Sequence, residues 1–87
     1  MRYIVATLDV VGQPEEGWEI NDQHQIGVID VTEDVLEDDE SLLAVLNENG
    51  FTNDLTTEEL EFVGDDTELT LHYWTTGFPI LSLIRQQ

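Results

Sequence analysis

The sequence has no lysine and no cysteine, and two arginines stand against twenty acidic residues, for a formal net charge of −18 over 87 residues. Without cysteine there is no disulfide framework and no thiolate metal site. Without lysine there is little to attract nucleic acid or an anionic membrane, because both are negative and are bound through Lys and Arg. The charge balance therefore predicts a basic protein as the partner, with no direct binding of nucleic acid and no membrane binding.

Long apolar runs are also missing. No stretch approaches the roughly 20 apolar residues of a membrane span. The N-terminal run MRYIVATLDVV is interrupted by Thr7 and Asp9 and lacks a small-residue cleavage site. We therefore expect no membrane span and no signal peptide. The length corresponds to a single domain over residues 1–87.

The residues that catalysis needs are scarce. The two serines, Ser41 and Ser82, and the two histidines, His24 and His72, are scattered along the chain. A hydroxyl nucleophile requires a base within hydrogen-bonding reach, and twenty carboxylates make some close acid pair inevitable, so such a pair carries no signal. We expect no enzyme activity and no cofactor. His72 is interpreted as a packed or half-exposed strand residue and His24 as a loop residue.

No dedicated metal site is predicted either. A calcium-binding EF-hand loop needs glycine at its sixth position and oxygen ligands at positions 1, 3 and 5. If Gly50 takes the sixth position, Val45 occupies position 1, and if Gly64 takes it, Val63 occupies position 5. Neither valine can bind a cation, so both alignments fail.

What is present is a series of strand-like segments separated by turn residues. Segments rich in β-branched and aromatic residues are predicted as strands at 2–11, 26–32, 60–63, 68–74 and 80–85. Turn residues between them, such as Gly12, Pro14 and Gly17, predict loops. The segment WEINDQHQ (18–25) is either a loop or the lead-in to the second strand.

A helix is predicted over residues 39–49. Asp38 is a good N-cap, and the two acids that follow it meet the positive end of the helix dipole. Gly50 lies where a left-handed C-terminal residue belongs, and Phe51 follows as the apolar contact of such a cap. Three leucines share one face of this helix: Leu42, Leu43 and Leu46.

These segments together predict an α+β fold of order β-β-α-β-β-β. We expect a small, mostly antiparallel sheet with one helix packed on one face, because that arrangement buries the three leucines most simply. The last three strands form a meander. An uncovered edge, such as that of strand 80–85, could pair with a second copy of the chain, so a homodimer is a further expectation.

The acids form two clusters, at 30–40 and 58–68. Asp38, Asp39 and Glu40 have a local use at the start of the helix, whereas the four acids before them precede its first turn and have none. We treat both clusters as one candidate electrostatic binding surface for a partner. Its residues are Asp30, Glu33, Asp34, Glu37, Asp38, Asp39, Glu40, Glu58, Glu59, Glu61, Asp65, Asp66 and Glu68.

The amount of charge suggests a function. Duplex DNA carries one charge per ~1.7 Å of its axis, so eighteen net charges correspond to roughly 31 Å of duplex. A compact chain of this length is about 30 Å across. The sequence therefore favours a DNA mimic, a non-enzymatic inhibitor that blocks a basic nucleic-acid-binding surface of another protein.

Two alternatives remain open. In the first, the protein is an interaction or structural module that uses an edge strand and its exposed aromatic residues, with Trp18 in a loop and Trp74 before a turn as the candidates. Its acidity would then serve solubility. In the second, the acidity is an adaptation to molar salt, where the Debye length shrinks to about 3 Å and repulsion is screened.

Several segments also resemble a known group of proteins. A glycine turn precedes Glu16-Gly17-Trp18-Glu19-Ile20-Asn21-Asp22, then come IGVIDV, an acidic helix ending in NGF, and FPILSLIR. Over nearly the whole chain this order resembles small uncharacterised proteins encoded by bacteriophages, although Gln13-Pro14 stands where that group has Asn or Asp after the glycine. The resemblance implies no activity and no functional residues. It implies a phage or mobile-element origin, in which short acidic proteins often inhibit host machinery such as defence proteins, here in the host cytoplasm.

Overall fold

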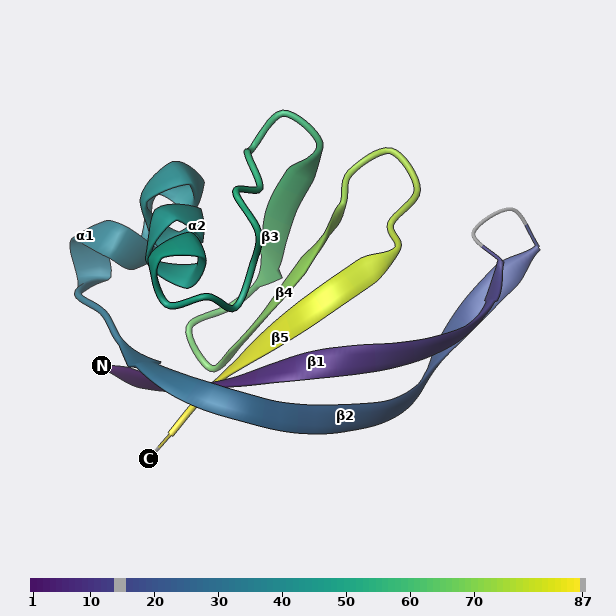
Figure 1. The fold of residues 1–87 in the computed structure, drawn as a ribbon, viewed down its shortest axis with the longest axis horizontal. Coiled ribbons are helices and arrows are strands. Elements are labelled where there is room, and N and C mark those ends of the chain that lie inside the picture. Colours follow the sequence, from purple (N-terminus) through teal and green to yellow (C-terminus); the bar gives the residue numbers. More distant parts are fainter. Residues whose placement is uncertain (14–15, 87) are drawn as a thin grey trace.

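The computed structural model describes residues 1–13 and 16–86. It contains a five-stranded sheet with two short helices between the second and third strands (Figure 1). The elements are β1 (Arg2–Gln13), β2 (Gly17–Asp30), α1 (Glu33–Leu36), α2 (Asp39–Glu48), β3 (Leu60–Gly64), β4 (Glu68–Tyr73) and β5 (Pro79–Arg85).

Every neighbouring pair of strands is antiparallel, in the order β2-β1-β5-β4-β3. The α+β class, the antiparallel sheet and the C-terminal meander of β3, β4 and β5 are thus confirmed. Strand 80–85 was predicted to offer an uncovered edge, and this is wrong. β5 lies in the middle of the sheet between β1 and β4, so both of its edges face other strands of the same chain.

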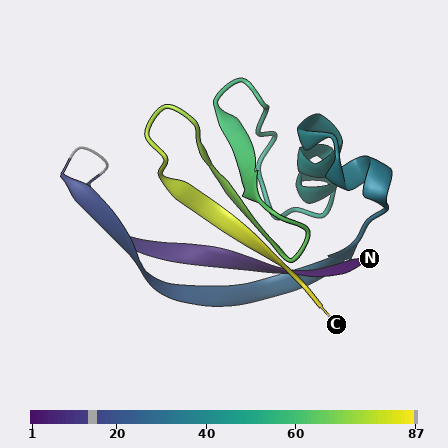
Figure 2. The same ribbon diagram turned by 180° about the vertical axis from the view of Figure 1, so that it is seen from behind.

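One face of the sheet forms the core with α2. Alternate residues of β1 and β5, such as Val5 and its cross-strand partner Leu83, point to this face and are fully buried. The three leucines of α2 complete the cluster. Figures 1 and 2 show both helices at one end of the molecule, beside β3 and away from the far end of the paired strands β1 and β2.

The predicted helix is confirmed to within one residue. The Asp38 side chain accepts a hydrogen bond from the Glu40 N–H at 3.3 Å and caps the first turn. At the other end Gly50 has φ +78°, and the Phe51 N–H donates to the Leu46 carbonyl at 3.0 Å. This six-to-one bond is the Schellman motif that the glycine and the following aromatic residue predicted.

A second helix was not predicted. Residues 33–36 form the single turn α1, so the helical segment has two parts and the predicted order with one helix is wrong in this detail. Thr32 is the N-cap residue of α1, but its side chain makes no capping hydrogen bond. With four residues and no cap, α1 gives little signal in the sequence.

The second strand is longer than predicted, because residues 17–25 belong to β2 and are not a loop. Two register shifts interrupt its pairing with β1: Val5 pairs with Gly27 but Ala6 with Gln25, and farther along the hairpin one more β2 residue is skipped. Each bulge reverses the alternation of side chains and increases the twist. The predicted turn at 12–17 includes residues 14 and 15, which lie outside the described residues.

No helix in the described part of the chain has the length and apolar character to cross a membrane.

Candidate partner-binding surface

The candidate acids are almost all at the surface. Of the thirteen predicted, twelve are exposed and Asp39 is half-buried. The Asp39 carboxylate accepts from the Phe62 N–H at 3.5 Å, which holds the first turn of α2 against the outer edge of β3. Asp39 therefore has a structural role, because it pairs with one backbone N–H on the outer edge of β3.

Most of the acids before α2 have a local structural role, contrary to the prediction from the sequence. Glu33 and Asp34 lie in the first turn of α1, where a carboxylate is favourable, although the effect is small for four residues. Asp30 is joined to Arg2 across the β1–β2 ladder by two hydrogen bonds of 3.3 Å. The expectation that four acids lack any local use is therefore wrong for three of them, and Glu37 alone remains.

The second cluster is centred on the β3–β4 turn. The Asp65 carboxylate accepts from the Thr67 hydroxyl at 2.6 Å, the Thr67 N–H at 2.9 Å and the Glu68 N–H at 3.2 Å. These donors hold the pKa of Asp65 below its usual value, and the Thr67 hydroxyl makes the largest contribution. Asp65 therefore shapes the turn, whereas the neighbouring Asp66 uses only its backbone carbonyl, which accepts from the Tyr3 hydroxyl.

The two clusters meet at one place. Glu33 of α1, Glu37 at the C-cap of α1 and Asp66 of the β3–β4 turn line the same hollow, with a volume of about 210 Å³. Met1 and Leu36 supply apolar lining, and Arg85 supplies a basic side chain. The carboxylates thus come from segments some thirty residues apart in the chain, a proximity that their sequence separation could not reveal.

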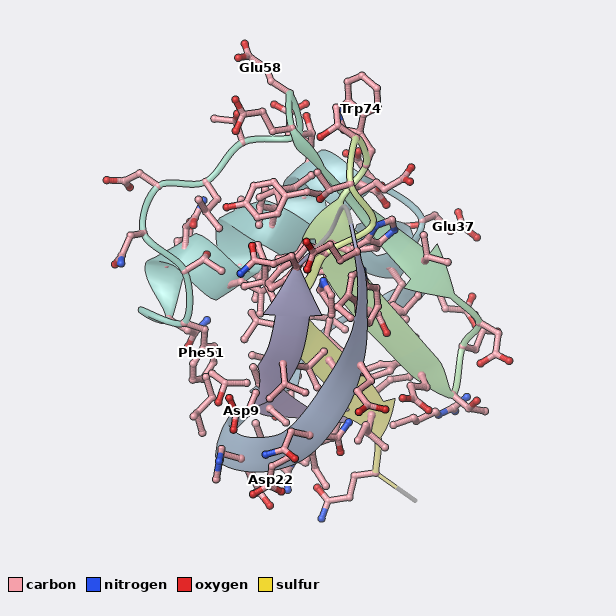
Figure 3. All side chains as sticks on the ribbon, turned by 90° about the vertical axis from the view of Figure 1, so that its right-hand side faces the viewer. Asp9, Asp22, Glu37, Phe51, Glu58 and Trp74 are labelled. Carbon is pink, nitrogen blue, oxygen red and sulfur yellow. The ribbon has the colours of Figure 1, made fainter. Side chains whose placement is uncertain are left out.

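Other candidate acids lie elsewhere. Glu58 is on the turn before β3, next to Trp74, whose indole N–H donates to the Glu58 carbonyl at 2.8 Å. Figure 3 shows this pair at one end of the view and Glu37 on another side. The structure therefore brings only part of the predicted surface together.

The sequence interpretation missed Asp9 and Asp22. They are directly opposite each other across the β1–β2 hairpin and lie together at the end of the view away from Glu58 (Figure 3). Like charges in this position oppose pairing, and the Asn21 side chain, which donates to Asp9 at 3.5 Å, offsets part of that. Only the register of the hairpin, with its two bulges, reveals this pair.

The two tryptophans differ in environment. Trp18 was placed in a loop, but it lies in β2 and is half-buried, with its ring 6.1 Å from that of Phe78. Trp74 is 57% exposed. Trp74 is therefore the better candidate for a contact with a partner.

The serines and one of the histidines considered for catalysis make hydrogen bonds to neighbouring residues of the fold. The Ser41 hydroxyl donates to Asp38 at 2.8 Å, and the buried Ser82 hydroxyl accepts from Gln23 at 3.4 Å. His72 is half-buried in β4, as predicted, with Nδ1 3.2 Å from the Tyr73 carbonyl. His24 lies in β2 and is not a loop residue.

The described residues include no group of three or more His, Asp or Glu side chains placed to hold a metal ion. Comparisons with protein-family models, with curated proteins and with solved structures found no match to this chain.

Proposed function

We propose that this protein is a non-enzymatic inhibitor of phage origin that covers a basic, nucleic-acid-binding surface of a host protein, such as a defence protein, in the cytoplasm of the host cell. The observation that carries the proposal is the hollow at which Glu33 and Glu37 meet Asp66. It brings three acids of the two clusters together, with Arg85 beside them, at the end of the molecule that carries the helices.

The density of charge supports a nucleic-acid mimic. The longest extent of the molecule is 37 Å, and a DNA duplex of that length carries about 22 phosphate charges. The net charge of the protein is −18. A basic groove that releases its counterions to bind DNA could also release counterions to the acids of this protein that face it, and the affinity should fall steeply with salt.

The proposal is tested by capture from a bacterial lysate at low salt. The captured proteins should be enriched in nucleic-acid-binding proteins, and duplex DNA or about 0.5 M NaCl, where the Debye length is roughly 4 Å, should release them. Capture that withstands this salt and is indifferent to DNA would contradict the proposal.

A matched pair of variants locates the contact. Glu37→Gln with Asp66→Asn removes one carboxylate of each cluster at the shared hollow, whereas Glu48→Gln with Asp54→Asn removes the same charge from exposed sites outside both clusters. The first variant should weaken capture more strongly than the second. Equal losses would mean that only the net charge matters.

A second candidate is favoured by the spread of the acids. Figure 3 shows acids on several sides of the molecule: Asp9, Asp22, Glu37 and Glu58. This spread is expected if the acidity serves solubility or is an adaptation to high salt. The protein would then be an interaction module that binds through its aromatic residues. Salt-resistant capture that is lost on Trp74→Ala would favour this function.

A further inference from the structure

The β1 strand is paired on both edges along only part of its length. Its ladder with β2 runs from Arg2 to Gln13, whereas its ladder with β5 covers residues 3–7 only. Among the described residues, therefore, 8–13 have a strand on one side and none on the other. In Figure 1 the β1–β2 hairpin curves away from β5 over this stretch.

A hollow lies beside the far end of this unpaired edge. It has a volume of about 500 Å³ and is lined by Gly12 and Gln13 of β1 and, opposite them, by Tyr73, Thr75, Thr76 and Phe78 around the β4–β5 connection. The aromatic residues Tyr73 and Phe78 give it an apolar side that a partner side chain can contact.

The end of β1 is exposed here, because Val11, Gly12 and Gln13 are all exposed residues. Gly12 has φ +103°, and a Cβ there would lie 2.4 Å from the Gly17 carbonyl oxygen, so the hairpin admits only glycine. The backbone that fills this space is that of Gly17 in the same hairpin, so Gly12 fixes the shape of the hairpin beside the unpaired edge. Alternate residues of an antiparallel strand direct their N–H and C=O groups to the same edge, which offers a ladder to an added strand.

The charge around the edge is negative. Asp9 and Asp22 are exposed on the hairpin, and Glu19 lines a smaller hollow that shares Gly12. Arg2 lies at the start of β1 and Arg85 at the end of β5, opposite Tyr3, so both arginines are at the other end of the strand. Within the part of the chain that the structure describes, no basic side chain lines either hollow.

From this juxtaposition we propose that the edge of β1 at residues 8–13 is a docking slot for an extended basic segment of a partner protein. The segment adds as a strand to β1, places an apolar side chain against Tyr73 and Phe78, and directs its basic side chains to the hairpin acids. The choice of a basic partner rests on the proposed function, but the contact is separate from the acidic hollow at α1. This recognition is β-augmentation, in which backbone hydrogen bonds provide affinity and pockets provide specificity.

The test uses a blocked octapeptide that alternates lysine and valine, added to the isotope-labelled protein and followed by NMR. Amide signals of residues 8–13 should shift, and alternate amides among them should exchange more slowly with solvent. Methylation of the peptide nitrogens along one edge removes hydrogen-bond donors without changing charge, and it should weaken binding roughly tenfold or more.

Two variants complete the test. Thr75→Trp adds a ring to the lining of the slot and should weaken binding of the lysine–valine peptide, whereas Thr57→Trp, on an exposed threonine at a different hollow, should leave it unchanged. If the methylated peptide binds equally well, if the shifts map to α1 or the outer edge of β2, or if no shift occurs, the slot is overturned. Salt-sensitive binding mapped to α1 would still support the proposed function. Equal binding of a glutamate–valine peptide would contradict the preference for a basic partner on which both the slot and the proposed function depend.

Discussion

The Tyr3 hydroxyl donates a hydrogen bond to the backbone carbonyl of Asp66 at 2.5 Å. Tyr3 is fully buried in the core, and Asp66 is exposed at the tip of the β3–β4 turn. This bond ties an acidic turn, which carries part of the proposed binding surface, to the first strand of the chain. Asp66 lines the same hollow as Glu33 and Glu37, so the bond holds the turn on their side of the molecule.

Tyr3→Phe should therefore destabilise the protein and loosen the turn. Loss of one hydrogen bond costs about 1 kcal/mol, because the exposed turn carbonyl can be solvated in its place. Urea unfolding measures the change in free energy. Tyr73→Phe is the control, since the half-buried Tyr73 hydroxyl has no hydrogen-bond partner among the described residues, and a loss as large there would contradict the assignment.

Burial raises the pKa of the Tyr3 phenol above its usual value of 10.0; Arg85 opposes this, and Asp66 and Asp65 add to it. A raised pKa means that the folded state favours the protonated form. This contribution to stability is thus complete below pH 10 and is lost as the pH rises through the folded-state pKa. Tyrosinate absorbance should show one group that ionises later than a free tyrosine, and Tyr3→Phe should remove it.

The packing of Phe51 on Gly27 leads to another prediction. A Cβ added to Gly27 would lie 2.5 Å from the Phe51 ring, which comes from the loop after α2. Gly27→Ala forces the ring to move, and we expect a loss of about 1–3 kcal/mol in unfolding free energy.

A double-mutant cycle separates this clash from other effects of the alanine. Phe51→Leu removes the ring atoms nearest to Gly27, so Gly27→Ala should cost less in that background, by more than about 0.5 kcal/mol. Additive losses would show that the ring is not what excludes a side chain at Gly27.

The sequence predicted best what depends on neighbouring residues. The Asp38 cap, the leucine spacing and the Gly50–Phe51 end of α2 act within a few residues, and they set the helix bounds to within one position. The first half of β2 was ambiguous because its two bulges disrupt the alternation by which a strand is identified. A one-turn helix such as α1 is too short for any periodicity.

Long-range pairing was beyond prediction. Whether strand 80–85 lies at an edge or in the centre depends on β1 pairing with it, and no local pattern encodes that choice. The candidate surface has the same limit. Both acidic clusters were visible in the sequence, but their meeting at Glu37 and Asp66 requires the β3–β4 turn to fold back beside α1.

Asp65 provides a test of the turn itself. Its hydrogen bonds to Thr67 and Glu68 lower its pKa, so its contribution to stability is present above pH 3.8 and is lost as the pH falls through the lower, folded-state value. Carboxyl NMR titration should find Asp65 ionising below pH 3.8. Thr67→Val removes the hydroxyl donor and should shift this pKa back upward; an unchanged pKa would contradict the assignment.

The high net charge predicts that salt stabilises the fold. Like charges on a compact body oppose folding, and raising NaCl from about 0.01 M to 1 M shortens the Debye length from roughly 30 to 3 Å. For a domain of this size, a gain of about 1 kcal/mol raises Tm by roughly 4–8 °C. Thermal unfolding followed by circular dichroism across this range should show a steady rise in Tm.

The pair of neutralised variants identifies the source of that gain. Glu37→Gln with Asp66→Asn relieves repulsion at the hollow where the clusters meet, so Tm in dilute buffer should rise and its salt dependence should be weaker than for Glu48→Gln with Asp54→Asn. Repulsion concentrated at the hollow is what a dense binding surface entails, since the partner's positive charge would offset it. Identical salt curves for the two variants would instead mean that the charge acts evenly over the surface, which favours the solubility function over the nucleic-acid mimic.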